Sequence, residues 1–194
     1  MKTFLLAFAT LAAGLGPAAE WAIDSAHSTA EFSVRHMMIT NVKGTLGPMT
    51  GAVVYDAANS AATRIEVSVP AASIDTNNAK RDADLRSADF FDAEKFPTMT
   101  FRSTSVKSAV AGRFSITGDL TFHGVTKEVV LEAEGFDSEV KDGQGNVKIG
   151  GTATTRINRK DFGLTWNRPL QSGAGMTVGD TVTLTFDLQL RKKE

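Results

Sequence analysis

The sequence contains no cysteine. This absence excludes disulfide bonds, thiol catalysis, iron–sulfur clusters and Cys-attached haem, so packing and backbone pairing have to stabilise the fold. A dominant charge is lacking as well, because 21 Lys and Arg residues face 22 Asp and Glu residues along the whole chain. Without a basic patch, the protein is not expected to bind nucleic acid.

A long hydrophobic run occurs only at the N-terminus, from Phe4 to Leu15. A lysine precedes it and small residues follow it, which is typical of a cleavable secretory signal peptide. A membrane-spanning helix needs roughly 20 apolar residues, more than this run provides. We therefore expect residues 1–19 to be a signal peptide that is cut near Ala18 or Ala19.

The remaining residues, 20–194, have a length that suits one domain with its own hydrophobic core. They contain no second run long enough to span a membrane, and no cysteine near the predicted cut that a lipid would modify. The mature protein is therefore expected to be soluble, in the periplasm or secreted.

Most of this domain alternates apolar and polar residues with a period of two, as strands with one buried face do. The last segment is clearest, with Leu184, Phe186 and Leu188 on one face and Thr185 and Asp187 on the other. Similar alternation occurs over residues 30–34, 65–69 and 114–116, and turn residues separate such runs at 56–60, 111–112, 123–124 and 142–146.

The pattern predicts an all-β domain of about eight antiparallel strands. Because open sheet edges promote aggregation, such strands usually close into a barrel or form a sandwich. The interior of an eight-stranded barrel is filled by its own side chains or holds one small ligand.

Two segments break the alternation. Asn77 to Pro97 is too long for a hairpin and too rich in Ala, Asp, Lys and Arg for a strand. We expect a short helical insert there, with Asn77 or Asn78 as the cap of one helix and Ser87 as the cap of a second. The stretch 171–179 contains three glycines and is predicted to be a mobile loop at the rim of the barrel.

Catalytic groups are sparse. Asp24, His27 and Ser28 are the residue types of an acyl-transfer triad, but no Gly-x-Ser-x-Gly turn is present to expose a nucleophile. In one extended strand, His27 and Ser28 would point to opposite faces, so Asp24 and Ser28 are instead expected to bond backbone. We predict that the protein is not an enzyme and has no cofactor.

The three histidines, His27, His36 and His123, also lack the spacing of a metal site. No His-x-His, His-x-x-x-His or Glu-x-x-His cluster occurs, and separated histidines in a β-rich chain more often bond backbone. We therefore predict no metal site.

Four ordered segments resemble the YceI-like family: WAIDSAHSTAEFSVRHMMITNVKG, RDADLRSADFFDAEKFPTMTF, GDLTFHGVTKEVVL and RINRKDFGLTWN. The resemblance covers Trp21 to Leu190. It implies a lipocalin-like, extended antiparallel β-barrel that binds polyisoprenoids or comparable long-chain amphiphiles. It also implies a periplasmic or secreted location and a possible homodimer.

On this basis we predict which residues contact a ligand. The inward-facing positions expected to line the tunnel are Phe32, Val34, Val67, Phe101, Phe114, Leu120 and Trp166. Flexible or aromatic side chains are expected at its mouth, namely Met37, Met38, Leu85, Phe90 and Phe91. The candidates for binding a polar head group are Arg35, His36 and Arg81.

The sequence therefore predicts an exported carrier of a long isoprenoid or fatty-acid-like ligand, such as a polyisoprenoid or an isoprenoid quinone. An apolar tunnel binds such a chain without catalytic groups, because each buried methylene contributes about 0.8 kcal/mol before ordering costs. Two alternatives remain open. One is an enzyme that acts on such a lipid inside the barrel, and the other is a structural or stress-response module whose interior is filled by its own side chains.

Overall fold

The computed structural model describes residues 18–55, 59–110, 112–171, 173 and 175–194, so most of the expected signal peptide lies outside the described residues. The strands are β1 (Ala19–Ile23), β2 (Thr29–His36), β3 (Thr40–Leu46), β4 (Thr50–Tyr55), β5 (Arg64–Pro70), β6 (Thr98–Val110), β7 (Arg113–Phe122), β8 (Val125–Gly135), β9 (Val140–Lys141), β10 (Val147–Asn158) and β11 (Val178–Lys192). The helices are η1 (Ser60–Ala62), η2 (Ala71–Ser73), α1 (Ala79–Arg86) and η3 (Arg159–Phe162).

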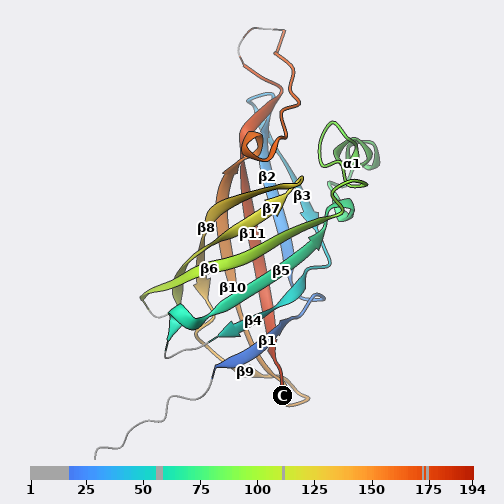
Figure 1. Ribbon diagram of the computed structural model, residues 1–194. Coiled ribbons are helices and arrows are strands. Elements are labelled where there is room, and N and C mark those ends of the chain that lie inside the picture. Colours follow the sequence, from blue (N-terminus) through green and yellow to red (C-terminus); the bar gives the residue numbers. More distant parts are fainter. Residues whose placement is uncertain (1–17, 56–58, 111, 172, 174) are drawn as a thin grey trace, which may run out of the picture.

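Eight of these strands form a closed antiparallel ring in the order β11, β1, β4, β5, β6, β7, β8 and β10, with β10 pairing back to β11. Both edges of β11 are therefore occupied. The ring confirms the predicted antiparallel barrel of about eight strands, and closure leaves its strands without a free edge along their paired length. In Figure 1, α1 lies beside one end of the barrel, termed the upper end here, and β1, β9 and the C-terminus lie at the lower end.

The hairpin of β2 and β3 extends the upper end beyond the closed ring. On one edge of β11, β1 pairs with residues 190–192 and β2 with residues 178–187. On the far side of the hairpin, β3 meets the next part of the chain through an isolated bridge between Thr45 and Asp75. The sheet is thus less completely paired at the upper end, where irregular segments cover it.

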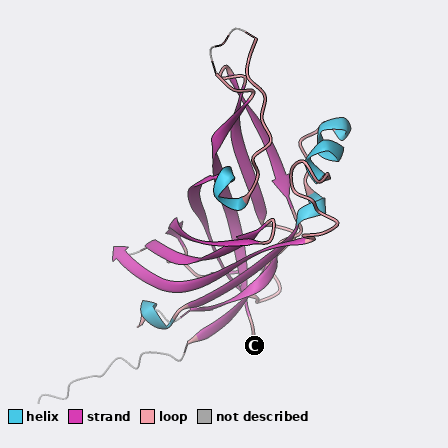
Figure 2. Ribbon diagram, turned by 45° about the horizontal axis from the view of Figure 1, so that its top comes forward, coloured by secondary structure: helices cyan, strands magenta, loops and turns pink. Residues whose placement is uncertain are grey.

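The helical insert is one of these segments (Figure 2). Asn78, one of the two predicted caps, is the cap of α1. Its side-chain oxygen accepts a hydrogen bond from the Arg81 backbone N–H at 3.0 Å. The prediction of a second helix after Ser87 is wrong. Ser87 ends α1, and the chain then forms successive turns before β6 begins at Thr98. Within the described ranges, no helix has the length and hydrophobicity that crossing a membrane requires.

The two ends of the predicted loop before β11 are joined by hydrogen bonds. Pro169 and Met176 form an isolated bridge, and the Asn167 side chain both accepts from Val178 N–H and donates to Val178 C=O. These bonds give the segment a defined start and end. Mobility of its middle part stays a prediction.

Candidate ligand cavities

The barrel encloses two adjoining cavities, termed the lower and the upper cavity. Strand residues form nearly all of the lower wall, whereas the upper wall also includes Leu85 of α1, Phe90, Phe91 and Leu164 from irregular segments. Every second residue of each strand faces the interior, because successive side chains of a strand point to opposite faces. These inward-facing side chains form both walls. The period-two pattern of the sequence thus supplies an apolar lining throughout the ring.

Both cavities are large enough to hold apolar groups. The volume that the centre of a water-sized molecule can occupy is about 120 Å³ in the lower cavity and about 150 Å³ in the upper one. A single water needs roughly 10–15 Å³ of such space and several polar partners. These walls provide space but few partners, and cavities of this kind stay dry and accept apolar guests.

A set of five side chains, termed the waist, belongs to both cavity walls. The waist consists of Val67, Phe101, Leu120, Leu184 and Phe186. Because the two cavities share these residues, they are neighbours along one interior. A flexible chain that passes the waist would contact both walls at once.

Polar groups are rare in the lower wall. Tyr55, Thr63 and Thr155 carry the hydroxyls among the described lining residues. Thr63 is 3% exposed, and within the described chain its hydroxyl has no hydrogen-bond partner. The same holds for the indole N–H of the core residue Trp21. A buried polar group without a partner is costly, and neighbouring atoms cover the Thr63 hydroxyl, so the surface that the lower cavity presents to a ligand is apolar.

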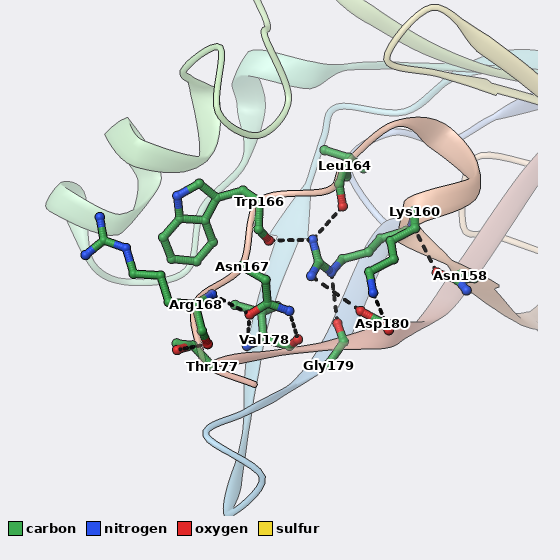
Figure 3. A network of polar contacts seen from close by, with 11 residues as sticks. Asn158, Lys160, Leu164, Trp166, Asn167, Arg168, Thr177, Val178, Gly179 and Asp180 are labelled. Atoms are coloured by element: carbon green, nitrogen blue, oxygen red, sulfur yellow. Dashed lines mark hydrogen bonds and ion pairs between the residues drawn. The ribbon is translucent and has the colours of Figure 1, made fainter. Parts of the chain in front are cut away.

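Arg159 is the cation of the upper wall, and it is 5% exposed. Its guanidinium donates to the carbonyls of Leu164, Trp166 and Gly179, and it pairs with Asp180 at 3.5 Å (Figure 3). Burial lowers the pKa of Arg159, while the Asp180 carboxylate raises it again. With these partners in place, Arg159 holds the loop before β11 against the barrel.

The bend that carries Arg159 follows from its neighbours. Asn158 caps η3 by accepting from the Lys160 N–H at 3.0 Å, and Gly163 ends it with φ of +80°. A left-handed residue at the end of a helical turn favours glycine. The short turn places the Arg159 side chain beside the segment that follows η3, where it bonds Leu164 and Trp166.

The structure places nine of the predicted contact residues in the cavity walls. Phe32, Val34, Leu85, Phe90 and Phe91 line the upper cavity, Phe114 lines the lower one, and Val67, Phe101 and Leu120 belong to the waist. Contact of any of these residues with a ligand stays a prediction.

Three predicted contact residues lie outside both walls. Trp166 packs on Phe90 with the ring centroids 5.0 Å apart, and thus supports the upper wall from behind. Met37 and Met38 are 44% and 40% exposed at the turn between β2 and β3. They belong to the outer surface at the upper end, and not to the cavity lining.

The structure does not gather the three head-group candidates at a cavity. Arg35 is exposed on the face of β2 opposite Val34, and its guanidinium is 3.5 Å from the Asn41 side chain. Arg81 donates to the hydroxyl and the carbonyl of Thr76. His36 is half-buried at the end of β2, and it is absent from both walls.

The residues of the candidate triad lie close together without the geometry of a triad. His27 Nδ1 is 3.1 Å from the Asp24 carboxylate, but the Ser28 hydroxyl donates to Gln189 C=O and accepts from Gln189 N–H. Ser28 thus joins two strands. The Asp24 carboxylate accepts hydrogen bonds from His27 and the Gln189 side chain, and its pKa falls to about 2.

No three His, Cys, Asp or Glu side chains gather as a metal would require in the part of the chain that the structure describes. His123 is at the tip between β7 and β8, where its Nδ1 lies 3.0 Å from the Phe162 carbonyl oxygen. The histidines thus occupy different places.

Sequence reasoning missed much of the lining. Apolar wall residues beyond the predicted set include Met49, Val53, Ile65, Val69, Met99, Val106, Ile116, Phe122, Leu131, Ala133, Ile149, Ala153, Ile157, Leu164, Val182, Leu184, Phe186, Leu188 and Leu190. Among these residues, the alternation of the last strand had already placed Leu184, Phe186 and Leu188 on one face. Arg159 and Thr63 gave no such signal, because a buried polar residue interrupts the pattern.

Comparisons with known proteins agree with this architecture. A model of the YceI-like domain matches residues 21–190. The UPF0312 protein of Ectopseudomonas mendocina is 43% identical over 157 residues, which cover 80% of this chain and 82% of the relative.

Solved structures share the fold. A YCEI protein from Campylobacter jejuni is 29% identical, with a TM-score of 0.69 and full coverage of both chains. A polyisoprenoid binding domain from Saccharophagus degradans has a TM-score of 0.62 at 15% identity, and the match covers 91% of this chain and 99% of that domain. Because the YceI-like domain model matches residues 21–190 and the relatives are this similar in sequence, the chain belongs to the YceI-like family.

Proposed function

We propose that this protein binds one long apolar chain of the polyisoprenoid class inside its barrel and carries that molecule without transforming it. The observation that carries the proposal is the pair of apolar cavities that meet at the waist. An elongated interior of this kind suits a linear hydrocarbon chain. The similar fold of a polyisoprenoid binding domain supports the same class of ligand.

The energetics suit a carrier. Each methylene that moves from water into the cavities contributes about 0.8 kcal/mol, before the cost of ordering the chain. A few isoprene units therefore suffice for tight binding without a charged contact. A carrier needs no reacting group, and the Ser28 hydroxyl is held by the Gln189 backbone instead of by His27.

The polar part of the ligand is proposed to be uncharged, as in an isoprenoid quinone or a phenol. The cation in the upper wall, Arg159, already donates to three carbonyls and pairs with Asp180. The lower wall presents apolar surface only, so it suits the hydrocarbon part of the ligand. A phosphorylated head group would have to stay at the surface.

The proposal includes export to the periplasm or the medium, which rests on the signal-peptide pattern of residues 1–19. Dimerisation, which the family resemblance implies, is checked by the size of the protein in solution. An exported carrier would move a water-insoluble molecule between membranes or protect it from reaction.

Native mass spectrometry of the protein purified from its exported compartment tests the proposal, followed by solvent extraction and identification of the released molecule. We expect one long-chain isoprenoid with a neutral head group per protein. A ligand-free mass that stays unchanged after incubation with quinones and prenyl alcohols would contradict the proposal and favour a barrel filled by its own side chains. Conversion of an added lipid into a product would instead identify an enzyme.

A further inference from the structure

An exposed apolar patch, termed the tip patch, lies at the upper end. It consists of Met37, Met38, Ile39 and Met176, which are 44%, 40%, 74% and 38% exposed. The first three belong to the turn between β2 and β3, and the last belongs to the loop before β11. Met37 N–H donates to Thr177 C=O at 2.7 Å, so the two segments form one surface. Three other large apolar side chains in the described residues are comparably exposed, and they are dispersed over β6, β8 and β9.

The backbone of the tip patch is unusual for its side chains. Met37 and Met38 have φ of +50° and +62°, and Ile39 N–H closes the turn on His36 C=O at 3.1 Å. Turns with two successive positive φ angles strongly favour Asn-Gly, because side chains such as methionine are strained there. Strained backbone positions cluster at sites of function, and two exposed methionines at this turn fit that rule.

The charge around the tip patch is positive. The segments 33–43 and 164–180 contain the cations Arg35, Lys43 and Arg168 and one carboxylate, Asp180. Asp180 is neutralised by its pairs with Arg159 and Lys160. These two segments are therefore basic, whereas the helical insert from Asn77 to Pro97 at the same end contains five carboxylates and four cations. Apolar side chains flanked by cations suit the surface of a bilayer that contains anionic lipids.

The tip patch also adjoins the upper cavity. Val34 and Val178 line that cavity, and they lie on β2 and β11 within three residues of Met37 and Met176. His36, which precedes the turn, pairs with Val178 in the sheet. In Figure 1, the turn after β2 and the loop before β11 lie at the same end of the molecule.

We propose that the tip patch docks on an anionic lipid bilayer, so that the ligand passes between the membrane and the upper cavity with little exposure to water. Met37, Met38, Ile39 and Met176 enter the boundary between head groups and acyl chains. Arg35 and Arg168 face the anionic head groups. The role in ligand transfer rests on the proposed function, whereas the docking itself does not.

Co-sedimentation with vesicles of phosphatidylcholine, alone or mixed with phosphatidylglycerol, tests the docking. We expect the mature protein to bind the mixed vesicles more strongly, and salt to weaken that binding. The double variant Met37→Asn/Met38→Gly should bind at least roughly tenfold more weakly, because two apolar side chains are lost. The control Val140→Asn removes an exposed apolar side chain from β9 at the lower end and should bind as the wild type does.

The double variant suits the turn better than the wild type, so its melting temperature should be equal or higher, and unfolding would not explain a loss of binding. Its affinity for an isoprenoid presented in detergent should be unchanged, while transfer of that isoprenoid from vesicles slows. Equal vesicle binding by both proteins would overturn the proposal. A wild-type dimer that the double variant converts to a monomer, without vesicle binding by either, would overturn it in favour of self-association. Docking without any isoprenoid affinity would overturn the proposed function alone.

Discussion

The lower and upper ends of this barrel are held by different interactions. At the lower end, strand pairing closes the ring, and apolar residues of the strands line the cavity. At the upper end, three arginine side chains bond backbone carbonyls of irregular segments. Arg81 donates to Thr76, Arg86 to Ala72 and Ile74, and Arg159 to Leu164 and Trp166. Arg159 also donates to Gly179 at the start of β11.

The comparison shows how one chain combines a stable barrel with an opening. Strand ladders satisfy backbone groups along the ring, but they leave no opening along a closed sheet. Side-chain bonds to carbonyls satisfy the backbone of irregular segments, which local rearrangement can release more readily. We therefore expect the upper end to admit the ligand and the lower end to receive the distal part of its chain.

The largest effect is expected from Arg159→Ala, which removes the side chain whose hydrogen bonds hold the loop before β11 at the upper end. The free energy of unfolding should fall by about 3–5 kcal/mol, because the carbonyls of Leu164, Trp166 and Gly179 lose their donor. Chemical denaturation measures this loss.

Lys160→Ala is the matched control, since Lys160 pairs with the same carboxylate at 2.8 Å but is 44% exposed. An exposed pair contributes about 0–1 kcal/mol, so this variant should remain close to the wild type. Equal losses for both variants would show that the carbonyl bonds of Arg159 do not hold the upper end.

Two buried threonines give a second comparison, with opposite signs. Thr76→Val at the upper end should destabilise the protein by about 1–3 kcal/mol, because the Thr76 hydroxyl bonds both Asp82 and Arg81. Thr63→Val in the lower wall removes a hydroxyl without a partner and should stabilise the ligand-free protein by about 1 kcal/mol.

Thermal melts of both ligand-free variants measure the difference. Destabilisation by Thr63→Val would show that its hydroxyl has a partner in solution.

The smallest effect concerns acid stability at the lower end, where Asp24, in the turn between β1 and β2, contacts Lys148 of β10 and Gln189 of β11. Its carboxylate lies 3.1 Å from His27 and 3.5 Å from Lys148, and its pKa is lowered to about 2. A carboxyl group whose pKa is lower in the folded than in the unfolded state stabilises the protein above the unfolded value. That contribution is present above about pH 4 and disappears as the pH falls toward 2.

The melting temperatures of wild type and Asp24→Asn should therefore differ near neutral pH and converge as the pH falls from about 4 to 2. Differential scanning calorimetry across this range is the measurement. A difference that persists at pH 2 would mean that the carboxylate charge is not what stabilises this corner.

The ring was predictable from the sequence because its determinants are local and periodic. Leu184, Phe186, Leu188 and Leu190 alternate with polar residues, and the structure turns that alternation into the inward face of β11. Asn78 was predictable as one of two candidate caps, because an asparagine before a helix accepts an orphan backbone N–H.

The remainder depended on contacts that are distant in the sequence. The Arg159 side chain bonds carbonyls of a later loop, and Thr63 is buried beside a cavity that other strands form. Arg35 was predicted as a head-group residue because a guanidinium offers several donors, but the alternation of β2 turns it to the outer face. Because Val34 was predicted to face inward, the same alternation predicts that its neighbour Arg35 faces away from the tunnel.

The most direct test of the account is the affinity for neutral isoprenoids of increasing chain length, measured with two matched variants. Ala153 lines the lower cavity alone and Ala30 the upper cavity alone, and each is 4% exposed. In the wild type, affinity should rise with each added unit until both cavities are filled. Ala153→Phe should bind short chains normally and lose the gain from long ones, whereas Ala30→Phe should weaken binding of all lengths. An affinity that is independent of chain length, or a loss of short-chain binding in Ala153→Phe alone, would contradict one continuous ligand site across the waist.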